Sequence, residues 1–282
     1  MTSPRTLLST WTLSPKKQFG QNFLTNPKTA EMIVSRSFIS KEDIVLEIGA
    51  GLGALTLPLA LASETVYAVE KDMNLLPLLK NELLAKNIGN VILMNENILE
   101  TDIESLAAKH GRKIVVLGNL PYNISSQVLV KLIIQRKYLS RAVLMFQKEL
   151  SERICAKPGG KDYGRISVML RYCADIFKIA DVKASLFYPQ PKIDSQIIEI
   201  KFRESPDFPA DDEKFLFRVI KAAFGKRRKT LRNSLSGSEL EIDAKTALSA
   251  LNLSGIDPAR RAETLTVEEF VKLSNAISKR TG

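Results

Sequence analysis

Cysteine and histidine are scarce in this 282-residue sequence, which has two cysteines, Cys155 and Cys173, and a single histidine, His110. No Cys-x-x-Cys or His-x-x-x-His spacing occurs, so the sequence predicts neither a disulfide framework nor a structural metal site. Hydrophobic runs are short as well: the longest, residues 54–62, is far below the roughly 20 residues that span a bilayer. Residues 1–21 lack the apolar segment of a secretory signal, and we therefore expect a cytoplasmic protein without a membrane span.

The composition is that of a folded protein with an excess of positive charge. Apolar residues make up 45% and charged residues 26% of the chain, which excludes a wholly disordered protein. Lysine and arginine number 41 against 31 aspartates and glutamates, giving a net charge of +10. This excess favours a polyanionic partner, and a basic protein without such a partner is the alternative until the charge is located along the chain.

Short apolar runs alternate with segments of helical periodicity in the first part of the chain. The runs predict buried parallel strands, and segments 74–86 and 125–134 predict helices between them. These runs are residues 44–48, 66–70, 91–94, 114–117 and 142–146. The alternation predicts a doubly wound α/β fold. Two further strand-like runs, residues 174–182 and 195–202, are expected to form an antiparallel pair that closes the sheet.

Residues 204–212 combine prolines, a serine and acidic residues, a composition typical of a linker that leads into a helix. The sequence after this linker has helical periodicity. Its apolar faces are formed by Phe215, Val219, Ala222 and Ala223, and by Phe270, Leu273 and Ile277. We therefore predict an α/β domain over residues 1–203, with a flexible segment at 1–20, and a small helical domain over residues 204–282.

Residues 47–53, Glu-Ile-Gly-Ala-Gly-Leu-Gly, follow the first predicted strand and open a helix. Glycines in such a loop permit a tight turn and let a ligand approach the backbone closely, which is typical of nucleotide-binding loops. Glu70, at the end of the next strand, is placed to hold ribose hydroxyls. Gly49, Gly51 and Ala54 also satisfy the pattern of a dinucleotide-binding loop, so the loop alone does not decide which nucleotide is bound.

Residues 119–122, Asn-Leu-Pro-Tyr, follow a predicted strand at the sheet edge where α/β proteins bind ligands, and resemble the Asn/Asp-Pro-Pro-Tyr signature of amino methyltransferases. The exocyclic amine of adenine is a poor nucleophile because its lone pair is delocalised into the ring. Two acceptors that hold its hydrogens favour the attacking geometry, and the candidates are Asn119 Oδ1 and the Leu120 carbonyl oxygen. Pro121 fixes the backbone, and Tyr122 offers an aromatic face to a flipped base. A strand-terminating turn without chemistry is the alternative.

Over nearly its whole length, the chain resembles the ribosomal RNA adenine dimethyltransferases, the family of the kasugamycin-resistance enzyme. The matching segments are residues 16–24, 47–53, 119–125, 147–149, 163–164, 187–195 and 224–231. The resemblance implies a class I, Rossmann-like methyltransferase domain followed by a small helical domain. It also implies N6,N6-dimethylation of two adjacent adenines in the loop of the 3′-terminal hairpin of 16S rRNA, coupled to small-subunit biogenesis.

The same resemblance implies S-adenosylmethionine as the cofactor. The implied cofactor-binding residues are Asn22, Leu24, Gly49, Gly51, Glu70, Asn97 and Asn119. The family usually has Asp where this chain has Asn97, whose amide oxygen still accepts a hydrogen bond; Glu96 is the alternative acceptor. Phe187 matches the family's aromatic residue that packs on the target base opposite Tyr122, and a core position beside a proline turn is the alternative for Phe187.

The densest basic segment of the sequence lies in the helical part. Its charges come from Lys221, Lys226, Arg227, Arg228, Lys229 and Arg232. On a helix with Phe224, Leu231 and Leu235 turned inward, they would form a face that binds RNA phosphates, and a solvated basic face is the alternative.

The resemblance implies 16S rRNA within the small (30S) ribosomal subunit as the partner, and we expect a monomer. A large-subunit rRNA adenine methyltransferase is one alternative, because that sister family shares the glycine loop, Asn-x-Pro-Tyr and a helical tail. Residues 187–195 and 227–231 favour the small-subunit family. The sequence also leaves open a ribosome-assembly factor with a secondary methylation role and, more distantly, a nicotinamide oxidoreductase.

Overall fold

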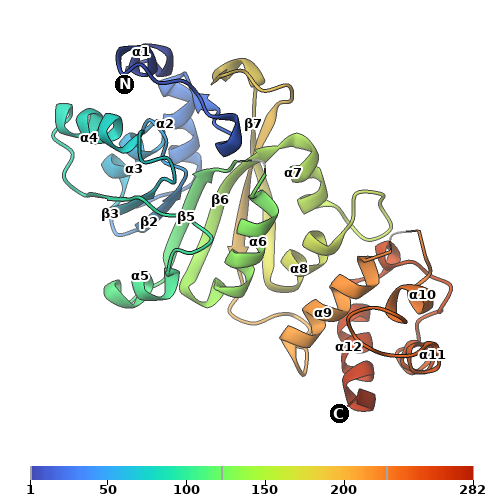
Figure 1. The fold of residues 1–282 in the computed structure, drawn as a ribbon. Coiled ribbons are helices and arrows are strands. Elements are labelled where there is room, and N and C mark those ends of the chain that lie inside the picture. Colours follow the sequence, from blue (N-terminus) through green and yellow to red (C-terminus); the bar gives the residue numbers. More distant parts are fainter. Residues whose placement is uncertain (1, 122, 227, 282) are drawn as a thin grey trace. The chain divides into compact units, whose positions relative to one another are not determined.

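The computed structural model describes residues 2–121, 123–226 and 228–281 (Figure 1). Contacts between Cα atoms divide the chain into two compact units, the first comprising Met1–Ser151 and Phe177–Phe202, the second Glu152–Ile176 and Arg203–Gly282. The predicted boundary after residue 203 is adjacent to the junction at residue 202. Residues 152–176, which the prediction assigned to the first domain, pack with the second unit. The assignment of a separate function to each domain stays a prediction.

The first unit contains the strands that the aliphatic runs predict, with bounds that differ by three residues or fewer. Its elements are α1 (Pro4–Thr10), β1 (Phe23–Leu24), α2 (Pro27–Arg36), β2 (Ile44–Ile48), α3 (Thr56–Ala62), β3 (Thr65–Val69), α4 (Leu76–Ala85), β4 (Val91–Met94), α5 (Ile103–His110), β5 (Ile114–Asn119), α6 (Ser125–Ile134), β6 (Leu139–Gln147), β8 (Phe187–Tyr188) and β9 (Ser195–Phe202). Helix α7 (Lys148–Cys155) and strand β7 (Ala174–Val182) each cross from one unit to the other.

The described residues form a central sheet of seven strands in the order β4-β3-β2-β5-β6-β9-β7. The strands from β4 to β6 run parallel, as the alternation of strands and helices predicts, and β9 runs antiparallel to β6. β9 and β7 are neighbours at the end of the sheet, where the last two strand-like runs were expected. Strand β2 lies between β3 and β5, which is the point where the strand order reverses and doubly wound sheets bind their ligands.

Both faces of this sheet are covered. All five residues of β2 are buried, although successive side chains point to opposite faces. On one face, Ile33 of α2, Leu59 of α3 and Leu79 of α4 belong to the same hydrophobic cluster as Val45 and Val66 of the strands. Burial on both faces explains why these strands are continuous aliphatic runs and not alternating ones.

Residues 1–20, for which we predict flexibility, include folded elements in this structure. Leu7 and Leu8 of α1 are buried in a cluster with Leu75 and Leu78. A short 3-10 helix, Lys17–Phe19, follows, and strand β1 then pairs antiparallel with β8. The N-terminal residues therefore pack on the first unit through α1, and the chain is held again by β1 directly after them.

The second unit is helical. Besides the end of α7 it contains α8 (Arg165–Cys173), α9 (Glu213–Phe224), α10 (Leu231–Leu235), α11 (Ala244–Leu253) and α12 (Val267–Thr281). The acidic linker predicts the start of α9, where Asp212 Oδ1 accepts a hydrogen bond from the Phe215 N–H group at 3.0 Å. Phe224 stacks on Phe270 with ring centroids 5.9 Å apart. Leu273, on the same helix as Phe270, is fully buried. Across the described residues, every helix is too short or too polar to act as a transmembrane span.

The prediction of one continuous helix through the basic segment is wrong. Helix α9 ends at Phe224 and α10 begins at Leu231, so Lys226, Arg228 and Lys229 lie between the two helices and not on one of them. Gly225 follows the end of α9, and Thr230 is the extended residue that precedes α10. Leu231 and Leu235 are nevertheless fully buried, as predicted, because the short α10 turns both side chains inward.

Candidate active site

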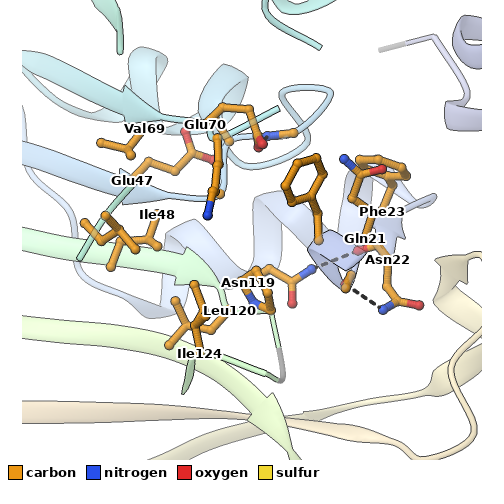
Figure 2. Close-up of a pocket in the computed structure, with 18 of the residues that line it drawn as sticks. Gln21, Asn22, Phe23, Glu47, Ile48, Val69, Glu70, Asn119, Leu120 and Ile124 are labelled. Carbon is orange, nitrogen blue, oxygen red and sulfur yellow. Dashed lines mark hydrogen bonds between the residues drawn. The ribbon is translucent and has the colours of Figure 1, made fainter. Parts of the chain in front are cut away.

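The predicted motifs meet at the carboxyl edge of the central sheet (Figure 2). In the strand register, Ile48 lies beside Val69 of β3 and beside Gly118 of β5. The glycine loop after β2, the acidic residue after β3 and Asn119 at the end of β5 therefore start side by side. The fit is close at Gly118, because a Cβ atom there would lie 2.6 Å from the Ile48 carbonyl oxygen. A larger residue at Gly118 would push the strand that carries Asn119 away from the glycine loop.

A cavity of about 300 Å³ opens at this edge, within the size range of small-molecule sites. Each predicted cofactor-binding residue lines it: Asn22, Leu24, Gly49, Gly51, Glu70, Asn97 and Asn119. Leu120 and Pro121 of the second motif line it too. Tyr122 and Arg227, two further predicted site residues, lie outside the described residues. The structure thus brings the cofactor-binding candidates from five separate segments of the chain into one cavity.

The backbone amides of the glycine loop donate hydrogen bonds within the protein. The N–H groups of Gly49 and Ala50 donate to the Val69 carbonyl oxygen at 2.9 and 3.1 Å, and the Gly51 N–H donates to Glu70 Oε2 at 2.9 Å. Gly49 and Gly51 have φ angles of 74° and 55°, the left-handed region that favours glycine. A dinucleotide-binding loop offers its amides to a pyrophosphate instead. This loop therefore fits a nucleoside ligand without a pyrophosphate.

Glu47 is a buried carboxyl group that lines the cavity. Its Oε2 atom has no hydrogen-bond partner among the described residues, and only 1% of the residue is exposed. Burial raises the pKa of Glu47 to about 8, and the charge of Glu70 acts in the same direction. A positively charged group in the cavity would reverse this effect by favouring the carboxylate. The site therefore fits a ligand that carries a cationic centre.

Glu70 lies at the end of β3 with its carboxylate held by the backbone. Oε1 accepts a hydrogen bond from the Asp72 N–H at 2.8 Å, and Oε2 accepts one from the Gly51 N–H at 2.9 Å. Burial raises the pKa of Glu70, and these two hydrogen bonds oppose that rise. Each carboxylate oxygen keeps a second lone pair, which can accept a hydrogen bond from a ribose hydroxyl.

Asn119 is held in one orientation at the end of β5. Its Nδ2 donates a hydrogen bond to the Asn22 carbonyl oxygen at 3.0 Å, which leaves Oδ1 as an acceptor (Figure 2). The turn that follows is also fixed, because the Pro121 carbonyl oxygen accepts a hydrogen bond from Ser125 Oγ at 2.9 Å. The Leu120 side chain is 1% exposed and anchors the turn in the core. These contacts fix the positions of Asn119 and of the Pro121 carbonyl group.

Phe187 occupies a core position. It lies opposite Leu24 in the β1–β8 pair, and 4% of the residue is exposed. Phe187 belongs to the hydrophobic cluster of the first unit and is not among the described residues that line the cavity. This is the placement that the sequence analysis kept as the alternative. Packing of Phe187 on a target base stays a prediction, as does the role of Tyr122.

Asn97 lines the cavity with its amide engaged on both sides. Oδ1 accepts a hydrogen bond from the Leu99 N–H at 3.2 Å, and Nδ2 donates to Glu100 Oε1 at 3.0 Å. Only an amide can make the second contact, because a carboxylate at position 97 would face the Glu100 carboxylate. The presence of Glu100 thus gives a physical reason for asparagine at this position. Glu96, the alternative acceptor, lines the same cavity.

Comparison with known proteins matches residues 12–279 to the ribosomal RNA adenine dimethylases. The protein named Ribosomal RNA small subunit methyltransferase A in Desulforapulum autotrophicum is 54% identical over 98% of this chain and 97% of its own length. The protein of the same name in Magnetococcus marinus is 42% identical over 95% of this chain and 94% of its own. The crystal structure of a dimethyladenosine transferase from Plasmodium falciparum has a TM-score of 0.78 and 27% identity, covering 92% of this chain and 98% of that one. This chain belongs to the ribosomal RNA adenine dimethylase family.

Family membership confirms the predicted fold class and reaction class. The chain is an S-adenosylmethionine-dependent rRNA adenine dimethyltransferase, and the nicotinamide oxidoreductase alternative is thereby removed. The cavity fits this cofactor on its own chemistry, because Oε2 of the buried Glu47 has no hydrogen-bond partner among the described residues and the Gly49, Ala50 and Gly51 amides already donate within the protein. Glu70 would hold the ribose, and Asn97 or Glu96 the adenine amine, of the bound cofactor.

The basic residues predicted to bind RNA differ in whether their side chains form ion pairs within the protein. Lys221 Nζ forms an ion pair with Glu239 Oε2 at 2.6 Å. Lys226, Arg228, Lys229 and Arg232 are exposed, and within the described chain none of these four forms an ion pair. For a family that acts on RNA, these four are the stronger candidates for phosphate contacts, and RNA binding by the patch stays a prediction.

Two residues that the sequence analysis missed hold walls of the cavity. Asp72 accepts hydrogen bonds from Lys16 Nζ at 2.8 Å and Gln21 Nε2 at 2.9 Å. Lys131 Nζ donates to two backbone carbonyl oxygens of residues 99–101, at 3.1 and 2.7 Å. No local pattern points to either residue, because each joins segments that are 30 or more positions apart in the sequence.

Proposed function

We propose that this enzyme transfers two methyl groups to N6 of each of two adjacent adenines in the loop of the 3′-terminal hairpin of 16S rRNA. It acts in the cytoplasm as a monomer, on the small (30S) ribosomal subunit, during biogenesis of that subunit. The names of its relatives support the small subunit as the substrate. The hairpin loop suits the reaction because unpaired bases in RNA are turned out of the stack at little cost.

The observation that carries this proposal is the fixed amide of Asn119 at the edge of the cavity. The hydrogen bond from Nδ2 to the Asn22 carbonyl oxygen leaves Oδ1 to accept one N6 hydrogen of the target adenine. The Leu120 carbonyl oxygen accepts the other. Asn22 lines the cofactor cavity. The hydrogen bond between Asn119 and Asn22 therefore links the proposed acceptor for the base directly to the wall of the cavity that would hold the methyl donor.

When bound, S-adenosylmethionine supplies an electrophilic methyl group. In the first transfer to an adenine, Asn119 Oδ1 and the Leu120 carbonyl oxygen hold the two N6 hydrogens so that the nitrogen lone pair points at the methyl carbon. In the second transfer, one of these oxygens holds the single hydrogen that remains. Positive charge develops on N6 as the new N–C bond forms and the bond between the methyl carbon and its donor breaks, with the electron pair of that bond left on the donor. The two oxygens stabilise the charge on N6 electrostatically. No general base is needed before transfer, and the N6 proton leaves to solvent afterwards. Each transfer replaces one N6 hydrogen by one methyl group.

The test measures methyl transfer from labelled S-adenosylmethionine to small subunits that lack methylation in the 3′-terminal hairpin. Mature small subunits and large subunits serve as controls, and mass spectrometry of RNA fragments locates the label. We expect up to four methyl groups per 16S rRNA, on two adjacent adenines, and none on the controls. Label on large subunits alone would assign the enzyme to 23S rRNA, and binding without label would favour an assembly factor.

The matching variant is Asn119→Ala, which we expect to abolish transfer while RNA affinity stays unchanged. Asn252→Ala is the control, because Asn252 is an exposed amide on α11 of the second unit. Full activity of Asn119→Ala would contradict the mechanism.

A further inference from the structure

Residues 18–22 line one wall of the cofactor cavity, and a single carboxylate fixes the segment 16–22 that contains this wall. Lys16 Nζ donates to Asp72 Oδ1 at 2.8 Å, and Gln21 Nε2 donates to Asp72 Oδ2 at 2.9 Å. The Lys16 N–H also donates to Gln21 Oε1 at 2.7 Å, which closes a ring of hydrogen bonds between the two ends of the segment. Both oxygens of Asp72 are thus engaged by residues that lie more than 50 positions earlier in the chain.

Asp72 is itself held next to Glu70, the residue expected to bind the ribose. Its side chain is 4% exposed, and its backbone N–H donates to Glu70 Oε1 at 2.8 Å. Burial acts to raise the pKa of Asp72, but the hydrogen bonds from Lys16 and Gln21 outweigh it and hold the pKa below its usual value. A charged carboxylate therefore stands between the ribose-holding residue and the wall.

The other side of the wall contacts the turn that holds the target amine. The Asn22 carbonyl oxygen accepts the hydrogen bond from Asn119 Nδ2 at 3.0 Å (Figure 2). Gly20 lies so close to Pro121 that a Cβ atom on Gly20 would be 3.4 Å from the Pro121 Cβ. Residues 16–22 are therefore in contact with both reacting sides: the loop of Glu70 and the turn of Asn119.

We propose that Asp72 is a positioning residue for methyl transfer, which through Lys16 and Gln21 holds residues 16–22 against both the cofactor cavity and Asn119. This inference rests on the proposed function, because it assigns a role within the same reaction. Without the carboxylate, the wall would lose its attachment beside Glu70, and the Asn22 carbonyl oxygen would no longer hold the Asn119 amide in one orientation. The alternative is that Asp72 only stabilises the loop between β3 and α4, where it also accepts a hydrogen bond from the Asn74 N–H at 3.2 Å.

The variants separate these two roles. Lys16→Met removes one donor to Asp72 from a side chain that is 32% exposed, and leaves the loop contacts of Asp72 intact. Lys16→Arg keeps the charge and should restore function. Asp72→Asn removes the carboxylate charge, and the double variant tests whether the two changes act through one contact. Glu82→Gln is the matched control, because Glu82 also binds the N-terminal residues, through Thr2 at 2.7 Å, but lies away from the cavity wall.

Two readouts do not depend on methyl transfer. The first is the Kd for S-adenosylhomocysteine by titration calorimetry, and the second is hydrogen exchange of the backbone amides of residues 14–24. We expect Lys16→Met and Asp72→Asn each to raise this Kd by roughly tenfold and to accelerate exchange in that segment. The double variant should be no worse than Asp72→Asn, whereas Lys16→Arg and Glu82→Gln should match the wild type. The Kd for the rRNA hairpin should not change.

In the transfer assay, the KM for S-adenosylmethionine should rise and kcat should fall in the same two single variants, because both sides of the reaction lose their common support. Wild-type exchange and wild-type Kd in Lys16→Met would overturn the inference and leave Asp72 a structural residue of its loop. If the wild type bound S-adenosylhomocysteine but methylated no rRNA, the proposed function would fail, while the exchange and Kd measurements would still decide the role of Asp72.

Discussion

The buried carboxyl group of Glu47 makes the stability of the enzyme depend on pH. Burial raises its pKa from 4.5 to about 8 in the folded protein, with Glu70 acting in the same direction. In the unfolded chain the carboxyl group ionises near its ordinary pKa. Between these two values the folded state keeps a proton that the unfolded state has lost. The free energy of unfolding therefore falls as pH rises from 4.5 to 8, and levels off above pH 8.

The magnitude follows from the size of the pKa shift. One bound proton changes the free energy of unfolding by about 1.4 kcal/mol per pH unit, so Glu47 alone lowers it by about 3 kcal/mol between pH 5 and pH 7. Replacement by glutamine keeps the shape of the side chain and removes the proton. Glu47→Gln should therefore lose this part of the pH dependence, whatever its effect on stability at a single pH.

Urea-induced unfolding, followed by circular dichroism at pH 5, 6 and 7, measures this dependence. Glu31→Gln is the control, because Glu31 is an exposed residue of α2 in the same unit. We expect the wild type and Glu31→Gln to show the same slope, and Glu47→Gln to be flatter by about 1.4 kcal/mol per pH unit. Equal slopes in all three proteins would refute the reasoning, since they would mean that Glu47 ionises alike in the folded and unfolded states.

The same group links cofactor binding to pH. A cationic ligand in the cavity favours the carboxylate, so binding releases the proton of Glu47. The affinity for S-adenosylmethionine should rise by up to tenfold per pH unit between pH 6 and pH 8, and should be insensitive to pH in Glu47→Gln. S-adenosylhomocysteine, which lacks the sulfonium charge, should show a weaker dependence. Calorimetric titrations that gave the same pH profile for the wild type and Glu47→Gln would contradict this link.

Three further predictions concern the cavity walls and the basic residues. Asn97→Asp should raise the KM for S-adenosylmethionine about tenfold, because the new carboxylate would face Glu100 Oε1, which lies 3.0 Å from the Asn97 amide nitrogen. Adding Glu100→Gln should reverse most of this rise. A lower KM in Asn97→Asp would be inconsistent with the contact. Lys131→Met should raise the same KM about tenfold with little change in kcat, because two hydrogen bonds to the backbone of residues 99 and 101 are lost. Steady-state kinetics measures both constants, and an unchanged KM would exclude a role of Lys131 in holding the cavity wall. Arg228→Ala should weaken hairpin binding roughly fivefold and reduce the salt slope by about 0.7 to 0.9. Lys221→Ala should change both less, because Lys221 is paired with Glu239. Filter binding at several salt concentrations measures both quantities, and wild-type affinity with a wild-type salt slope in Arg228→Ala would contradict an RNA contact by Arg228.

Much of the central fold can be predicted from the sequence because the physical cause is local. Residues 44–48 form a strand buried on both faces, so every position is apolar except Glu47. The glycine loop and the Asn119 turn follow strands whose order along the chain predicts a common edge, and the register of Ile48 with Gly118 confirms it. The burial of Leu231 could also be predicted, because the spacing of Leu231 and Leu235 is a local signal.

The remainder depends on contacts between distant segments. Strands β1 and β8 have two residues each, too few to show any periodicity, and they exist because they pair with each other. The contact of Lys16 with Asp72 likewise has no local signal. The error in the basic segment is different in kind: Gly225 and Thr230 are typical residues for a helix end and a helix start, and they could have predicted the break between α9 and α10.

The pairing of β1 with β8 also has a consequence for the order of events during synthesis. Phe23 and Tyr188 face each other in this pair but are about 165 residues apart in the chain. At a synthesis rate of 5–20 residues per second, the earlier strand waits roughly 8 to 33 s before its partner has been made. The cavity wall that β1 continues thus acquires its neighbour only when two thirds of the protein has left the ribosome. The segment that carries one wall of the cofactor cavity is therefore without its strand partner until late in translation.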